Sequence, residues 1–229
     1  MSKRLLKAGI LIAVLVLPAF VFIFLNVFGE NRFDLPYYFP ELDESGRPQV
    51  VSGDTVFHRV PDFTLINQNN QEIALKDLSD IKIANFFFTR CGTICPLMNS
   101  NIARVQNQFD HTAKVSFISI SIDPEHDSVM VLKDYAATFD AVESNWNFLT
   151  GKKDYIYDLA IKGFKLPVSD ASVYDPEITD IDDAFIHSEK ALLLDKDNYI
   201  RGIYDATSKP DMERLNVEIK VLLDSYEKQ

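Results

Sequence analysis

Cys91 and Cys95 are the two cysteines of this 229-residue chain, and three residues separate them in the stretch Cys-Gly-Thr-Ile-Cys-Pro. A disulfide between them would close a very short loop and would remove little entropy from the unfolded chain. We therefore expect the pair to serve chemistry rather than to staple the fold. A spacing of four positions can also place both side chains on one side of a helical turn, within reach of one ion. A reactive disulfide and a metal site both remain compatible with this spacing.

The residues around the pair predict a buried strand that leads into a helix. Residues 81–89 contain three consecutive phenylalanines, which is typical of a strand buried on both faces. After Cys91, apolar residues recur every three or four positions, which predicts a helix with Pro96 in its first turn. The apolar positions are Ile94, Met98, Ile102, Val105 and Phe109. A helix N-terminus carries a partial positive charge, which favours a thiolate over a thiol.

The rest of the chain predicts an α/β fold. We expect strands at 115–122 and 146–149, helices at about 128–139 and 155–164, hairpins at 63–75 and 188–204, an acidic loop at 169–183, and a closing helix capped by Ser208. Strands that alternate with helices of this length imply parallel crossovers, and the late hairpin adds an antiparallel pair. This order matches a thioredoxin-like α/β sandwich.

An apolar N-terminal segment predicts one transmembrane helix. Residues 8–29 carry no charge, and as a helix they would be about 33 Å long, enough to cross the hydrocarbon of a bilayer. The segment is longer than a signal-peptide core and ends without a small-residue cleavage site, so we expect an uncleaved anchor. Lys3, Arg4 and Lys7 would keep residues 1–7 in the cytosol and place the rest on the extracytoplasmic, periplasmic side.

The remaining residues divide into a linker and one domain. Residues 30–58 are rich in Pro, Gly and polar residues and predict a tether, and residues 59–229 are long enough for one globular domain. The formal net charge of the chain is −11. Because a phosphate backbone would repel such a domain, we expect no nucleic-acid partner.

Three stretches of the sequence resemble the Sco (SenC) family of copper-binding assembly factors. They are Phe87–Pro96, Ser121–Asp127, and Ile186-His187-Ser188 with the residues that follow it. The resemblance covers about residues 55–225 and the anchor, although Gly92 stands where the family commonly has Pro. It implies that Cys91, Cys95 and His187 bind one copper ion. It also implies a metallochaperone that matures the binuclear copper site of cytochrome c oxidase, with the copper-site subunit and a copper donor protein as partners.

Coordination chemistry is consistent with this implied ligand set. Two soft thiolates select Cu(I) or zinc over hard ions, and an imidazole completes a three-coordinate set that Cu(I) accepts. A structural zinc would want a fourth protein ligand, and the chain has no third cysteine. The resting oxidation state, Cu(I) or Cu(II), stays open.

The main alternative function is enzymatic. Cys91 and Cys95 could cycle between dithiol and disulfide and reduce a partner protein, as an extracytoplasmic thiol-disulfide oxidoreductase does. That role would leave His187 unexplained, although the two functions can coexist because copper-site cysteines must be reduced before they are loaded. We expect Asp123–Asp127 to form either a turn with a helix cap or a support for the site. We expect His58, His111 and His126 on the surface and the carboxylates of 175–183 in a solvated loop.

Overall fold

The computed structural model describes residues 12, 14–24, 34–109, 114–170, 185, 186 and 188–227. The chain divides into two compact units, Met1–Asp34 and Leu35–Gln229. In the first unit residues 12 and 14–24 are helical, and their apolar side chains are exposed. None of the helices in the described ranges is both long enough and apolar enough to span a bilayer.

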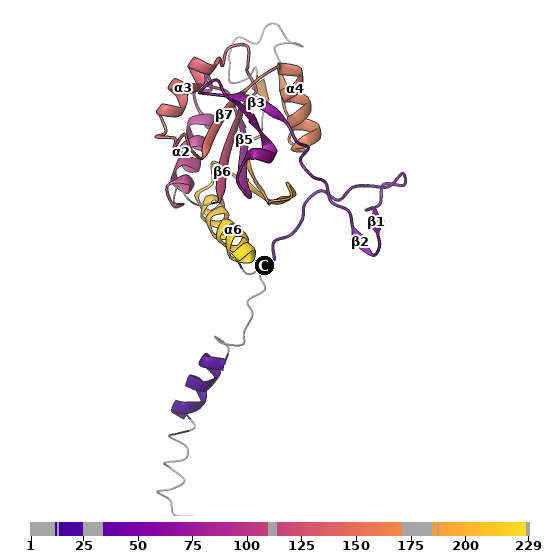
Figure 1. Ribbon diagram of the computed structural model, residues 1–229, viewed down its shortest axis with the longest axis vertical. Coiled ribbons are helices and arrows are strands. Elements are labelled where there is room, and N and C mark those ends of the chain that lie inside the picture. Colours follow the sequence, from indigo (N-terminus) through magenta and orange to yellow (C-terminus); the bar gives the residue numbers. More distant parts are fainter. Residues whose placement is uncertain are drawn as a thin grey trace, which may run out of the picture. The chain divides into compact units, whose positions relative to one another are not determined.

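The second unit is built on one seven-stranded sheet in the order β11-β10-β5-β6-β7-β3-β4 (Figure 1). Strands β5, β6 and β7 are parallel, and the other neighbours pair antiparallel. The strands are β3 (Thr64–Asn67), β4 (Glu72–Ala74), β5 (Ile81–Phe87), β6 (Val115–Ser121), β7 (Trp146–Thr150), β10 (Lys190–Leu194) and β11 (Ile200–Asp205). The mixed sheet confirms the predicted α/β class, including both hairpins.

Helices connect and cover the sheet. They are α2 (Ile94–Gln106), α3 (Val129–Ala137), α4 (Lys153–Asp158) and α6 (Lys209–Glu227), together with a 3₁₀ turn at Leu75–Asp77. The helix expected at 155–164 begins as α4 and continues as a π-helical turn, Leu159–Gly163. Ser208 accepts a hydrogen bond from the Asp211 N–H at 3.4 Å, so the predicted cap of the last helix is confirmed.

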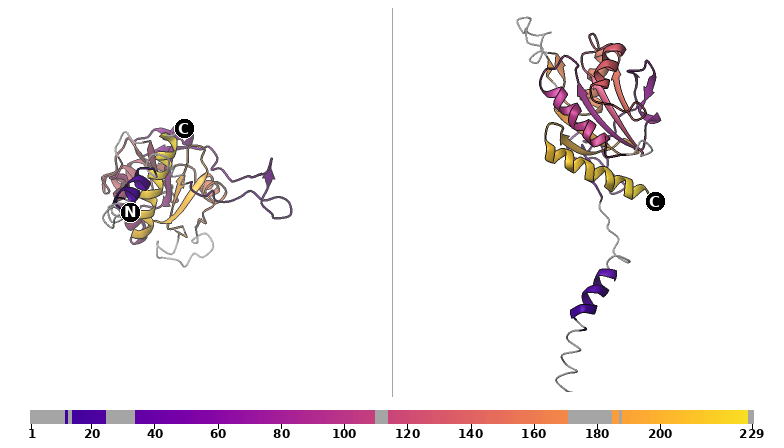
Figure 2. Two further views of the ribbon diagram at one scale, coloured as in Figure 1. Left: turned by 90° about the horizontal axis from the view of Figure 1, so that it is seen from below. Right: turned by 90° about the vertical axis from the view of Figure 1, so that its left-hand side faces the viewer.

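Alternate side chains of β5 separate the two faces of the sheet. Phe87 stacks on Tyr135 of α3, with ring centroids 5.1 Å apart, whereas Phe86 meets Phe164 after the π-helical turn. Because successive strand residues point to opposite faces, α3 covers one face and the segment after α4 covers the other. Helices α2 and α6 contact each other and lie side by side (Figure 2). The face that carries α2 and α3 is the one that positions the cysteines.

The segment that we expected to be a tether contacts the domain. Leu35 is buried, and the guanidinium of Arg201 donates to the carbonyl oxygens of Leu35 and Pro36. Arg201 is itself buried and paired with Asp195 at 3.0 Å. Farther along, β1 (Val50–Val51) and β2 (Asp54–Thr55) form a small hairpin that projects away from the sheet in both Figure 1 and Figure 2.

A second small hairpin flanks the expected acidic loop. Strand β8 (Ser169–Asp170) pairs antiparallel with β9 (Phe185–Ile186), with Ser169 opposite Ile186 and Asp170 opposite Phe185. Residues 171–184 lie outside the described residues, so the expectation of a solvated acidic loop stays a prediction.

Candidate metal and redox centre

Strand β5 ends at Phe87, shortly before Cys91, and α2 begins at Ile94, between the two cysteines. Cys91 lies in the loop between the two elements and is 5% exposed, whereas Cys95 is the second residue of α2 and is fully buried. Both are present as thiols. The predicted strand-to-helix junction is thus confirmed, with Gly92 and Thr93 exposed at its rim.

The sulfur of Cys91 caps the start of α2. The backbone N–H of Cys95 donates to the Cys91 Sγ at 3.3 Å, and the side chain of Thr93, the capping position, makes no cap hydrogen bond. A helix start normally uses a side-chain oxygen for such an N–H group. Because N–H donation and the positive end of the helix both favour negative charge, this geometry stabilises a thiolate at Cys91.

A buried carboxylate holds the residues that precede Cys91. Each oxygen of the Asp127 carboxylate accepts two hydrogen bonds. Oδ1 accepts from the Thr89 hydroxyl at 2.5 Å and from His126 Nδ1 at 3.0 Å. Oδ2 accepts from the Thr89 N–H at 3.1 Å and from the Ser121 hydroxyl at 2.5 Å. We call Thr89, Ser121, His126 and Asp127 the Asp127 junction. It ties the loop after β5 to the end of β6.

An ion pair adds a second tie to the same loop. Arg90, the neighbour of Cys91, donates from Nε at 3.0 Å and from a terminal nitrogen at 2.5 Å to one oxygen of Asp123. Asp123 is buried, and Arg90 is 41% exposed. The two interpretations of Asp123–Asp127 are therefore both partly right: Ser128 caps α3, and the aspartates support the cysteine loop.

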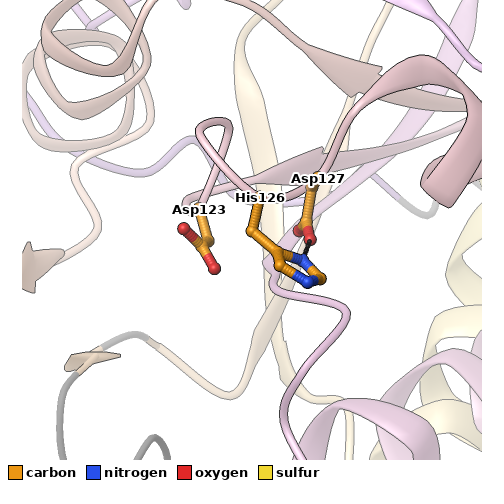
Figure 3. Close-up of side chains that lie close together, drawn as sticks. All are labelled: Asp123, His126 and Asp127. Atoms are coloured by element: carbon orange, nitrogen blue, oxygen red, sulfur yellow. Dashed lines mark hydrogen bonds and ion pairs between the residues drawn. The ribbon is translucent and has the colours of Figure 1, made fainter.

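Asp123, His126 and Asp127 also have the residue types of a metal site. Their ligand atoms lie within 4.8 Å of one another, and Figure 3 shows the three side chains on the turn that follows β6. The carboxylate of Asp127 already accepts four hydrogen bonds, one at each of its lone-pair positions, and the carboxylate of Asp123 accepts from Arg90. A metal ion would have to displace these donors, so the cluster is better described as a support for the loop.

His187 lies outside the described residues, and its predicted approach to the two sulfurs stays a prediction. Its predecessor in the chain, Ile186, closes β9, which pairs with β8. The Lys153 ammonium bonds Asp170 of β8 at 2.6 Å and lies 3.6 Å from Glu125. Desolvation lowers the pKa of Lys153, but Asp170 and Glu125 outweigh it, so the net shift is upward. This ion pair connects β8 to the start of α4.

The other histidines have different environments. The side chain of His126 is 44% exposed, as expected. The expectation for His58 was wrong, because its side chain is 13% exposed and both ring nitrogens have partners, Glu41 Oε1 at 2.9 Å and the Gly163 carbonyl oxygen at 2.8 Å. The packing of residues 35–58 on the domain buries it. His111 lies outside the described residues.

Two residues near the pair escaped the sequence analysis as functional candidates. Asn99 is fully buried one turn after Cys95, and its amide nitrogen donates to the Tyr135 hydroxyl at 3.2 Å. Burial raises the pKa of Tyr135, the Asn99 hydrogen bond lowers it in part, and Coulomb repulsion from Cys95, Cys91 and Asp127 raises it further. A polar residue four positions after Cys95, within an apolar stripe, was the available signal.

Comparison with known sequences agrees with this architecture. The SCO1/SenC family profile matches residues 53–223. The SCO1 protein homolog of Bacillus subtilis is 31% identical over 170 residues, which are 73% of this chain and 84% of that protein.

Solved structures of Sco family proteins are similar to this chain. A SCO1/SenC family lipoprotein of Bacillus anthracis superposes with a TM-score of 0.62 at 28% identity, over 72% of this chain and 95% of that one. BsSco, described with a disulfide switch and as a member of the Sco family of cytochrome c oxidase assembly proteins, gives 0.60 at 30% identity, over 71% and 92%. Bradyrhizobium japonicum ScoI, solved with copper bound, gives 0.57 at 23% identity, over 72% and 99%, a likeness of fold. This chain belongs to the SCO1/SenC family.

Proposed function

We propose that this protein binds one copper ion through Cys91, Cys95 and His187 and delivers it for assembly of the binuclear copper site of cytochrome c oxidase. The observation that carries the proposal is the pair of buried thiols at the start of α2, where the Cys95 N–H donates to the Cys91 sulfur. Family membership supports it, because a relative is described as a cytochrome c oxidase assembly protein and another was solved with copper bound.

The ligand chemistry suits a transferable ion. Two thiolates and one imidazole satisfy Cu(I) in a three-coordinate site, and the open position would admit a ligand from an acceptor protein. Binding releases the thiol protons, and the N–H group and helix end that face Cys91 lower the cost of that release. The partners in this proposal are a copper donor protein and the copper-site subunit of the oxidase.

We further propose that residues 8–29 form a transmembrane anchor with residues 1–7 in the cytosol and the domain, residues 59–229, on the periplasmic side. Support comes from the uncharged run and from the basic residues before it. In this arrangement residues 30–58 connect the anchor to the domain. The carbonyl oxygens of Leu35 and Pro36 accept hydrogen bonds from Arg201 on β11.

The experiment is a competitive Cu(I) titration of the reduced full chain in detergent micelles. Wild type should bind one Cu(I). His187→Ala should weaken binding by more than about tenfold, because even residues that only support ligands are worth that much. Cys91→Ser and Cys95→Ser should each abolish tight binding, and His111→Ala is the matched control. Equal affinity of His187→Ala and His111→Ala would overturn the three-ligand site.

A second candidate is thiol-disulfide exchange with a partner protein. The capped Cys91 sulfur favours it, because a stabilised thiolate can attack a partner disulfide and form a mixed disulfide. The Cys95 thiolate can then attack the Cys91 sulfur, which forms the Cys91–Cys95 disulfide and releases the reduced partner. Reduction of a model disulfide by wild type and by His187→Ala at equal rates, with weak copper binding in both, would favour this function over copper delivery.

A further inference from the structure

Residues 40–57, which we call the arm, form a small antiparallel unit that stands apart from the sheet of the domain in both Figure 1 and Figure 2. Its paired residues are Pro40 with Phe57, Leu42 with Pro48, Val50 with Thr55 and Val51 with Asp54. Residues 42–55 are exposed without interruption. Because a small hairpin of this kind is only marginally stable by itself, the arm needs contacts with something else.

The base of the arm is fixed to the domain. His58 follows the arm, and its ring nitrogens contact Glu41 Oε1 at 2.9 Å and the Gly163 carbonyl oxygen at 2.8 Å. Tyr37 precedes the arm and stacks on Phe57, with ring centroids 5.2 Å apart. These contacts hold the base and leave the far end of the arm exposed. A partner that binds there therefore meets a segment that is already ordered, which lowers the cost of binding.

The arm has one apolar face and one polar face. Residues that pair directly across two strands point to the same face, and so do alternate residues along one strand. These two rules place one set of side chains together, which we call the apolar face: Pro40, Leu42, Pro48, Val50, Thr55 and Phe57. They place a second set on the opposite face: Glu41, Gln49, Val51, Asp54 and Val56.

The apolar face is exposed and carries no charged side chain. Leu42 is 60% exposed and Val50 is 59% exposed. Of the five charged residues within residues 40–57, Glu41 and Asp54 fall on the opposite face, and the other three lie in the turn at 43–47. An exposed apolar patch that is kept free of charges but rimmed by them is typical of an interaction site.

The lack of charge on this face indicates which partner it fits. A basic protein would find its complementary carboxylates on the opposite face and at the turn, whereas an uncharged apolar face fits another uncharged apolar face. A second copy of this chain supplies one, because two identical faces can meet around a two-fold axis. Six side chains of this size can each bury on the order of 80 Å², so two faces would bury about 1,000 Å², the lower limit for a specific interface.

We propose that the apolar face of the arm is the interface of a weak homodimer, in which the arms of two copies pack face to face. The charged residues of each arm lie outside this contact and stay in water. The formal net charge of −11 on each copy opposes the association, and salt screens that repulsion. The dimer brings two cysteine pairs into one particle, and its formation does not depend on copper.

Val50 and Val51 provide a matched pair of variants for the test. They are neighbours in β1 and are 59% and 54% exposed, but they point to opposite faces of the arm. Sedimentation equilibrium of the full chain in detergent micelles measures the dimer dissociation constant. Val50→Asp should raise this constant by at least about tenfold, because a two-fold interface contains the new charge twice, and Val51→Asp by less than about threefold. Added NaCl should lower the constant of the wild type, whereas it would weaken binding to a basic partner.

A second measurement avoids detergent, which can itself cover an apolar face. The full chain is placed in phosphatidylcholine vesicles with the photo-crosslinking residue benzoylphenylalanine at position 50 or at position 51. Irradiation should link position 50 to the arm of a second copy and give several-fold more crosslinked dimer than position 51. Equal yields from the two positions, crosslinks from position 50 to lipid alone, or no dimer in either experiment would overturn the inference. Neither experiment contains copper, so these outcomes are independent of the Cu(I) titration that tests the proposed function.

Discussion

The loop that carries the cysteines and the hairpin that leads to His187 are held in very different ways. The cysteine loop follows a seven-residue buried strand and is tied by the Asp127 junction, by the Arg90–Asp123 pair and by the Cys91 cap. Strands β8 and β9 contain two residues each, and the Lys153–Asp170 ion pair connects β8 to α4.

This difference suggests a division of labour between the proposed ligands. The fold arranges the two sulfurs before any ion arrives, which lowers the ordering cost of binding. The third ligand would depend on this hairpin of two short strands. An ion carrier benefits from such an arrangement, because the thiolates can retain the ion while the imidazole contact is exchanged for a ligand of the acceptor.

Removing the central carboxylate should have the largest effect on the firmly held side. Asp127→Ala leaves the Thr89 N–H, the Thr89 hydroxyl and the buried Ser121 hydroxyl without their acceptor, so the free energy of unfolding should fall by about 3 kcal/mol. Chemical denaturation followed by the fluorescence of the buried Trp146 measures it. Asp134→Ala, an exposed aspartate on α3, is the control. A loss below about 1 kcal/mol would show that the Asp127 junction does not hold the loop.

Breaking the neighbouring ion pair should have an intermediate effect. Arg90→Gln leaves the buried Asp123 carboxylate with a weaker partner, and we expect a loss of about 1–2 kcal/mol in unfolding free energy. The exposure of Arg90 keeps the value at the lower end. The same denaturation assay applies, with Arg47→Gln as a control because Arg47 pairs with Asp43 on the surface. Equal losses in both variants would contradict the special role of Asp123.

The smallest stability effect should come from the histidine side. Lys153→Gln should lower the unfolding free energy by about 1 kcal/mol or less, yet weaken Cu(I) binding, because it loosens β8 and not the sulfurs. Lys162→Gln, whose pair with Asp158 is exposed, should change neither quantity. If Lys153→Gln loses stability without losing copper affinity, the proposed dependence of the third ligand on β8 is wrong.

The elements around the site could be predicted from the sequence because they have periodic or local signals. The phenylalanine run of β5, the apolar stripe of α2 and Pro96 each determine structure within a few residues. These signals placed Cys91 and Cys95 where a strand leads into a helix, whereas their spacing left a reactive disulfide and a metal site both open.

The supports of the site have no such signal. Thr89 and Asp127 are 38 positions apart, and Trp146 and Ser119 are 27 apart, so only the completed sheet brings them together. The contact of His58 with Gly163 spans 105 positions and depends on the docking of a segment whose composition predicts a tether. Isolated polar residues in apolar stripes reveal their partners only when the fold is known.

The sulfur of Cys91 has one more consequence as the cap of α2. The sulfur that receives the Cys95 amide is the same atom that would bind an ion or form a bond to the other sulfur, through another of its lone pairs. A metal ion or a disulfide bond withdraws negative charge from this sulfur and weakens the hydrogen bond from the amide. The Cys95 amide therefore responds to the chemical state of the Cys91 sulfur, and its NMR resonance would report the loading and release of a copper ion directly.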